Sequence, residues 1–288
     1  MKQQSKSNRW LTAALLTPTG LWFAFMLVLP LIVILVFSFG ERAAVGGYAG
    51  GFTLEHYANL GARLKAFSNT LTYAPIGTFL SLLVAYPLAY YLAIKVNRRY
   101  KLMLLVLVIV PFWTSLLIRT YAWIYLLGGK GIPSILDWIG IEDVRLINTP
   151  GAVLMGIVYG YLPLMVFPIY VSLDKLNKSY LEASSDLGAS PYKTFMQVTL
   201  PLSMPGVATG CMLVFILLMG EFLIPAFLGG GKVFFIGNAL VDLFLQSRNW
   251  PFGSAISITL VVIMLITVSL YMRMTLRNSK TGVDESLM

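Results

Sequence analysis

The chain has 288 residues, of which 58% are hydrophobic and only 11% are charged, and its mean hydropathy is +0.79. This composition excludes an ordinary soluble globular domain and indicates an integral membrane protein. The net charge of +9 is explained by membrane topology and contact with anionic lipid, which makes nucleic-acid binding a poor alternative. The only cysteine, Cys211, excludes an internal disulfide framework, and the only histidine, His56, has no metal ligands grouped around it.

Six apolar runs are long enough to cross a bilayer, which takes about 20 helical residues. We expect the first run to be retained as a membrane helix, because it is about twice as long as the apolar core of a signal peptide. The predicted fold is an all-α integral membrane protein with six transmembrane helices. The runs cover residues 10–40, 66–94, 102–118, 146–173, 194–220 and 249–272.

The distribution of Lys and Arg predicts the orientation of these spans. An even number of spans places both termini on one side. That side, with the loops that share it, holds thirteen Lys and Arg residues, whereas the opposite loops hold seven. By the positive-inside rule, the N and C termini and the loop between spans four and five are expected to be cytoplasmic.

The expected outer loops are short. A Gly-rich stretch, 46–51, precedes a segment typical of a short amphipathic surface helix, 52–60. A second short helix is expected at 134–139, after turn signals, and 232–253 favours a surface or partly re-entrant helix because it is interrupted by Asp242. The chain has no GxxxxGK[ST] phosphate loop, so any ATP-derived energy must come from another subunit.

The polar segment EASSDLGASPYKTFMQVTLP, residues 182–201, stands out between apolar runs. Asn177 is a candidate N-cap for a helix that runs to about Leu187, and Gly188 is placed to end it in the left-handed conformation. Ser190 followed by Pro191 predicts a second helix, expected to end before Pro201. The carboxylates of Glu182 and Asp186 are four residues apart and share one helix face, where they can meet basic groups of a partner.

The Glu-Ala-Ser start, the Gly six residues later and the Val-x-Leu-Pro ending of this segment resemble the signature cytoplasmic loop of bacterial ABC importer permeases of type I. Ser184 replaces a usual Ala, and Val198 a frequent Ile. The resemblance implies coupling helices that dock into the ATPase subunit, with contributions from Glu182, Ala183, Ser184, Asp186, Gly188 and Ala189. Four other stretches, at 110–123, 220–230, 235–240 and 249–260, resemble the spermidine/putrescine permeases in particular.

Further expectations follow from this resemblance. They are a homodimer of ATPase subunits that binds ATP and Mg²⁺, a second homologous permease, an extracytoplasmic substrate-binding protein, and location in the bacterial inner membrane. No cofactor is expected in this chain itself, and it is not expected to be an enzyme. The implied organisation is an N-terminal part, 1–61, a transmembrane domain, 62–272, with a coupling loop at 174–205, and a cytoplasmic tail, 273–288.

Candidate pathway residues are ionisable or aromatic side chains within the spans. Glu221 either attracts a polyamine ammonium group, helped by cation–π contacts of nearby aromatic rings, or serves as a structural, hydrogen-bonded acid or partner of Arg119. Arg119 either lines the pathway or snorkels to the interface. Trp113 is a pathway or gate candidate, and Tyr121 lies in an expected aromatic belt.

Three classes of function remain to be compared. A polyamine importer subunit is favoured, with a related importer for iron, thiamine, phosphonate or opine as the alternative. An energy-independent channel is not excluded by composition, but the docking loop argues against it. A membrane enzyme is disfavoured because the chain has no HExxH motif, no GxSxG motif and no pair of an acid with a histidine within the spans.

Overall fold

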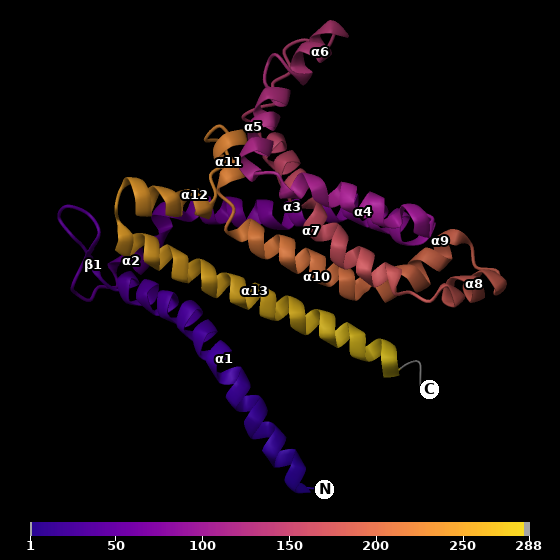
Figure 1. The fold of residues 1–288 in the computed structure, drawn as a ribbon. Coiled ribbons are helices and arrows are strands. Elements are labelled where there is room, and N and C mark those ends of the chain that lie inside the picture. Colours follow the sequence, from indigo (N-terminus) through magenta and orange to yellow (C-terminus); the bar gives the residue numbers. More distant parts are fainter. Residues whose placement is uncertain (1, 285–288) are drawn as a thin grey trace. The chain divides into compact units, whose positions relative to one another are not determined.

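The computed structural model describes the backbone of residues 2–284 and the side chains of residues 12–177 and 179–273. This part of the chain is predominantly helical (Figure 1). It divides into two compact units, one formed by residues 2–62 with 240–262 and the other by residues 63–239 with 263–284. The predicted tail 273–288 is therefore described only in part.

The first unit has a short helix at 55–58, inside the segment 52–60 where one was predicted, and a small hairpin that was not expected. In the Gly-rich loop, Glu41 pairs with Ala49 in an antiparallel ladder of two-residue strands. The Tyr57 hydroxyl donates a hydrogen bond of 2.8 Å to the Ser38 hydroxyl, and the His56 ring lies 3.0 Å from the Gly40 carbonyl oxygen. The elements are α1 (Lys2–Ser38), β1 (Glu41–Arg42), β2 (Tyr48–Ala49), α2 (Glu55–Ala58), η1 (Asn59–Arg63) and η4 (Asp242–Gln246).

The second unit contains most of the long helices. Helix α12 (Ile236–Val241) belongs to it up to residue 239, and α13 (Trp250–Asp284) belongs to it from residue 263. The short helix α6 lies where a helix at 134–139 was predicted. The other elements are α3 (Leu64–Tyr90), η2 (Tyr91–Lys95), α4 (Arg98–Trp113), α5 (Leu116–Leu127), α6 (Ile132–Trp138), α7 (Pro150–Asp174), α8 (Lys178–Asp186), α9 (Pro191–Thr194), η3 (Phe195–Thr199), α10 (Leu200–Met219) and α11 (Leu223–Leu228).

Helix α7 packs against both α3 and α10, and these three helices form the core of the second unit. Gly206 and Gly210 are four residues apart on α10 and allow its backbone to approach α7 closely. A Cβ atom at Gly206 would lie 2.5 Å from the Pro168 carbonyl oxygen, and one at Gly210 would lie 2.9 Å from the Met165 sulfur. Small residues at this spacing are typical of membrane helix interfaces, where close packing replaces the hydrophobic driving force.

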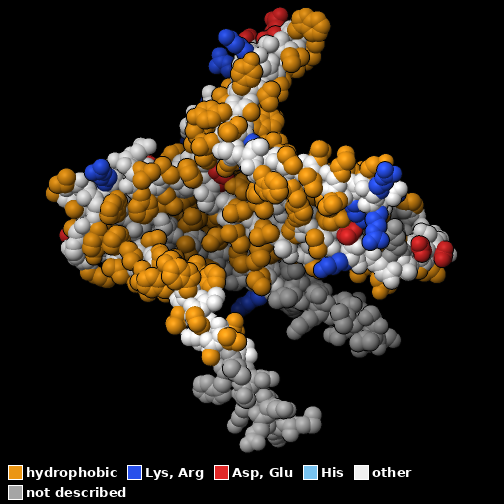
Figure 2. Space-filling view, in the orientation of Figure 1, with side chains coloured by type: hydrophobic (Ala, Val, Ile, Leu, Met, Phe, Trp, Pro, Cys, Tyr) orange, Lys and Arg blue, Asp and Glu red, His pale blue; other side chains and the backbone are white. Residues whose placement is uncertain are grey.

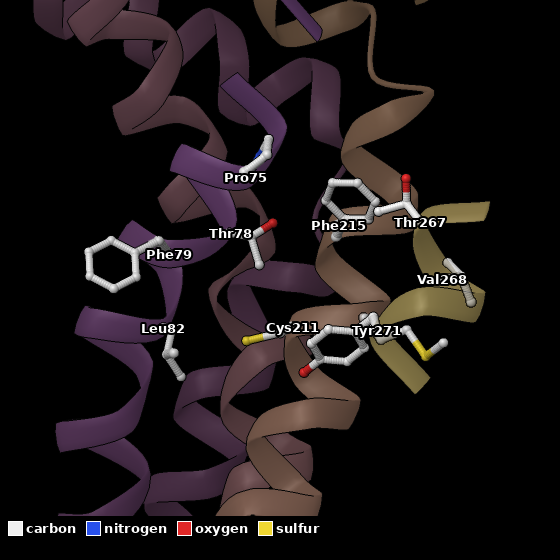
Figure 3. A pocket seen from close by; sticks show the side chains of 10 residues that line it. Pro75, Thr78, Phe79, Leu82, Cys211, Phe215, Thr267, Val268 and Tyr271 are labelled. Atoms are coloured by element: carbon white, nitrogen blue, oxygen red, sulfur yellow. The ribbon is translucent and has the colours of Figure 1, made fainter. Parts of the chain in front are cut away.

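An apolar groove of about 320 Å³ lies between α3, α10 and the part of α13 that belongs to this unit (Figure 3). Cys211 and Phe215 of α10 both line it, and the Tyr271 hydroxyl donates a hydrogen bond of 3.2 Å to the Ala208 carbonyl oxygen. The lining is almost entirely hydrocarbon, with Cys211 as a small apolar residue of the fifth predicted span.

Five helical runs of the described residues are long and apolar enough to cross a membrane. They are Thr12–Ser38, Glu55–Lys95, Pro150–Asp174, Pro191–Met219 and Trp250–Arg273. The predicted third span, 102–118, is not one continuous helix. It is broken after Trp113 and bends by 88°, so the count reaches six only if α4 and the helices that follow are taken as one span.

The prediction that the second polar helix ends before Pro201 was wrong. Helical structure continues from Pro191 to Met219 without interruption. The five residues of η3 form a π-helical turn, in which the Leu200 N–H bonds to the Phe195 carbonyl oxygen, five residues back. This widened turn immediately precedes Pro201, so a residue that has no N–H to donate and would crowd an ordinary α-turn is accommodated.

Candidate coupling loop and transport pathway

Helix α8 begins and ends where the sequence predicts. The Asn177 side chain accepts a hydrogen bond of 3.1 Å from the Ser179 N–H and caps the helix N-terminus. At the other end, the Ala189 N–H bonds to the Ser184 carbonyl oxygen at 3.1 Å, and the Gly188 N–H bonds to that of Ser185 at 2.9 Å. This pair of bonds is the Schellman motif, which requires a left-handed residue just past the helix.

Gly188 supplies that left-handed residue, with φ of +76°. Most other residues are strained in this conformation because of their Cβ atom. The chain therefore turns sharply between α8 and α9. Ser190 then caps α9, its hydroxyl accepting a bond of 3.4 Å from the Lys193 N–H.

A side-chain hydrogen bond also joins the two short helices. The Ser184 and Thr194 hydroxyl oxygens lie 2.9 Å apart, and both groups are partly buried. Thr194 did not stand out in the sequence, because its role depends on the folding back of α9 onto α8. The hydroxyl of Ser184 thus has a partner that an alanine in its place would lack.

The outer surface of this loop carries both charged and large apolar side chains. Glu182 and Asp186 are both exposed, as are the large side chains of Leu187 and Tyr192, which are 88% and 69% exposed. Figure 2 shows acidic side chains at the end of the second unit that carries α8, with basic side chains nearby. A groove of about 750 Å³ runs along the loop, lined by small residues of α8 and the turn, by Lys193 and by the start of α10.

An ion pair lies at the base of the loop. Lys101 of α4 donates to the Asp174 carboxylate at 2.5 Å and to the Ala93 carbonyl oxygen at 2.8 Å. Through these two bonds, the Lys101 side chain connects the last residue of α7 with the turn between α3 and α4. Sequence reasoning missed this pair because its members are 73 residues apart in the chain.

Glu221 is buried, with only 6% of its surface exposed. Its Oε1 atom accepts hydrogen bonds from the backbone N–H groups of Phe222, Leu223 and Ile224, at 2.9, 2.7 and 3.2 Å. The Tyr161 hydroxyl donates to Oε2. Both oxygens are thus used within the chain, and the carboxylate caps α11, an arrangement that favours its interpretation as a structural acid.

Within the part of the chain whose side chains are described, none of the other pathway candidates makes a hydrogen bond or ion pair with Glu221. Among the described side chains, no ion pair joins Arg119 to Glu221, and the guanidinium of Arg119 lies 5.7 Å from the centre of the Phe112 ring. Trp113 is 79% exposed at the end of α4. Tyr121 is also exposed and packs its ring edge against Phe227, with ring centres 5.3 Å apart.

Residues 85–278 match the family model described as the binding-protein-dependent transport system inner membrane component. This match covers more than half of the chain. The chain belongs to this family. It is accordingly an inner-membrane transport component, and the matched region contains the whole polar loop with α8 and α9.

Several relatives are similar over two thirds or more of their length. The spermidine/putrescine transport system permease protein PotB of Haemophilus influenzae is 42% identical over 88% of this chain and 90% of its own. PotB of Escherichia coli K12 is 40% identical over 91% and 98% of the two chains. The inner membrane ABC transporter permease protein YdcU of the same organism is 34% identical over 70% and 68%.

Solved structures support the fold. A chain in the crystal structure of a bacterial ABC transporter that imports the acidic polysaccharide alginate superimposes with a TM-score of 0.74, over 96% of this chain and 99% of its own. A chain of an alginate transporter in complex with an alginate-bound periplasmic protein superimposes with a TM-score of 0.76. The sequence identities are 19% and 20%, so these matches concern the fold alone.

Proposed function

We propose that this chain is the pore-forming permease subunit of an ABC importer that carries a polyamine such as spermidine or putrescine into the cytoplasm. The observation that carries the proposal is the identity of about 40%, over some nine tenths of both chains, to permeases named for these two substrates. Identity at this level across the whole transmembrane part supports a shared type of cargo.

The polar loop is the proposed transmitter of the energy. Glu182, Ala183, Ser184, Asp186, Gly188 and Ala189 would dock into an ATPase subunit, one of two identical copies that bind ATP and Mg²⁺. Three features support this: the capped helix α8 with the capped helix start at α9, a surface of small residues and two exposed carboxylates for basic partner groups. Closure of the ATPase dimer would push on α8 and so change the exposure of a central site.

The membrane arrangement belongs to the same proposal. It comprises six spans, with α4 and α5 counted as one, a cytoplasmic coupling loop at 174–205, and both termini in the cytoplasm. The transmembrane domain would cover residues 62–272. The excess of Lys and Arg in the loops assigned to the inside supports this orientation.

Two further partners complete the proposed transporter. A second homologous permease would form the other half of the pore, and a substrate-binding protein would deliver the cargo from outside the membrane. The binding protein is supported by the family's description and by the solved alginate transporter that carries a periplasmic protein.

Copurification tests the coupling loop. We expect the tagged chain to retain an ATPase subunit after purification from its native membrane, and Glu182→Lys to reduce the retained amount at least fivefold. Glu142→Lys is the matched control, because Glu142 is equally exposed but lies between α6 and α7, on the predicted outer side. Equal retention by the two variants would contradict docking through α8.

Stimulation of ATP hydrolysis tests the cargo. The purified complex in lipid, supplied with candidate binding proteins, should hydrolyse ATP faster when spermidine or putrescine is added. Stimulation by an anion or a ferric ligand only would show that the cargo belongs to another class.

A further inference from the structure

The break between α4 and α5 lies beside the middle of α7 in the second unit. Helix α4 ends at Trp113, α5 begins at Leu116, and the chain bends by 88° between them. The Leu116 side chain would be 3.9 Å from a Cβ atom placed on Gly160. Gly160 is the eleventh of the 25 residues of α7, about 15 Å along a helix of about 37 Å. The break is thus level with the middle of a membrane-spanning helix.

The backbone at this break is exposed and has no side-chain cap. Thr114 and Ser115 are both exposed, as are the flanking Trp113 and Leu117. The first N–H groups of a helix have no partner within the helix, and Ser115 makes no capping bond to those of α5. Thr114 uses its hydroxyl to donate to the Pro111 carbonyl oxygen, at 2.6 Å. The N–H groups at the start of α5 therefore need partners from outside.

A second helix break at the same level, between α10 and α11, has a side-chain cap from within the chain. Helix α10 ends at Met219 and α11 begins at Leu223, beside Tyr161, the neighbour of Gly160 in α7. There the buried Glu221 carboxylate binds three consecutive backbone N–H groups. The chain thus supplies internal hydrogen bonds where a break is covered by protein, and supplies none through Ser115 at the start of α5.

Arg119 adds a second polar group beside the open break. Its Nε atom is buried and has no hydrogen-bond partner among the described residues. It borders a hollow of about 270 Å³, together with Thr114, Ile118, Trp123 and Tyr159. A hollow of this size beside a polar group is large enough for several water molecules. Lipid chains offer neither this group nor the α5 backbone a hydrogen bond.

We propose that the α4–α5 break, Thr114 to Arg119, lines a water-filled part of the transport pathway. The inference rests on the proposed function, since it takes the chain to be half of a pore. Irregular backbone at membrane depth is stable where it is covered by protein or borders a water-filled cavity. The exposed turn, the uncapped α5 N-terminus and the buried Arg119 Nε atom without a hydrogen-bond partner among the described residues together favour water over lipid.

Cysteine labelling tests this inference in the complete complex, reconstituted in lipid. In a Cys211→Ala background, Thr114→Cys and Ser115→Cys are each treated with a charged, membrane-impermeant methanethiosulfonate that carries a trimethylammonium group. Modification is read from the mass of this chain. The matched control is Phe79→Cys, which is also exposed on a membrane helix and lies close in level, because its neighbour Gly77 packs on Ile157 of α7.

We expect at least one of the two turn variants to react tenfold or more faster than Phe79→Cys, in either the nucleotide-free or the vanadate-trapped state. The native Cys211, in its apolar groove, should react as slowly as the control. The inference is overturned if both turn variants react no faster than Phe79→Cys in both states, as burial against a second permease would produce. Labelling does not depend on the cargo, so a complex that fails to import polyamine still tests it.

Discussion

The hydroxyl groups of Ser184 and Thr194 lie 2.9 Å apart and connect α8 to α9 across the turn at Gly188. Together with the Schellman bonds at the end of α8, this contact fixes the angle between the two short helices. A loop that transmits a push from a soluble subunit must move as one body, since a flexible hinge would absorb the displacement. Ser184 thus adds a contact between α8 and α9 that an alanine at this position would lack.

Ser184→Ala should loosen the loop without unfolding it. Loss of a partly buried hydrogen bond of this kind costs about 1 kcal/mol, which corresponds to roughly fivefold faster hydrogen exchange of the amides in residues 182–194. Mass spectrometry of the exchanged complex measures this change. Ser185→Ala is the control, because the exposed Ser185 bonds only within α8, to the Leu181 carbonyl oxygen. Equal rates of hydrogen exchange in the two variants would contradict a role of the Ser184–Thr194 hydrogen bond in holding α8 and α9 together.

Gly188→Ala should weaken the association with the ATPase subunit. A non-glycine residue in the left-handed conformation costs about 1–2 kcal/mol, so the end of α8 would rearrange. Gly231→Ala is the matched control, since Gly231 has the same φ of +76° and equally open surroundings but lies outside the loop. The amount of copurified ATPase is the measurement. A loss in both variants would point to a general folding defect.

Glu221→Ala should lower the thermal midpoint of the complex more than Tyr161→Phe does. The first change leaves three backbone N–H groups of α11 without their acceptor, and each unsatisfied buried group costs about 1–3 kcal/mol. The second removes a single donor. An unchanged midpoint for Glu221→Ala, with loss of cargo-stimulated ATP hydrolysis, would instead indicate direct contact with the cargo.

Gly206→Ala should also destabilise the complex. The new methyl group would stand 2.5 Å from the Pro168 carbonyl oxygen, and forcing α10 away from α7 costs about 1–3 kcal/mol, as other overpacked sites do. Gly20→Ala is the control, because no atom lies within 4 Å of that position. Thermal unfolding followed by light scattering distinguishes the two. A midpoint equal to that of Gly20→Ala would show that the α7–α10 contact is looser than described.

Local chemistry made the turns and helix starts of the polar loop predictable. Asn177, Gly188 and Ser190 each act on backbone groups within a few residues of themselves, so their effects follow from the order of residues alone. The apolar runs were predictable for a similar reason, because each membrane helix satisfies its own backbone hydrogen bonds. The end predicted for the second polar helix was wrong, because that helix continues through Pro201 into the fifth apolar run. A π-turn is not marked by any residue type in this sequence.

By itself, the sequence determined that this is a helical membrane protein with a polar two-helix loop, since hydropathy and capping are properties of short segments. Only the tertiary structure decided what the isolated polar residues do. Glu221 caps α11 because Tyr161 and three backbone N–H groups of residues 222–224 surround it. Ser184 connects α8 to α9 because α9 folds back and places the Thr194 hydroxyl beside it. The break after Trp113 lies level with the middle of α7 because Leu116 packs beside Gly160. Such contacts join residues distant in the chain, and their formation depends on how the helices pack.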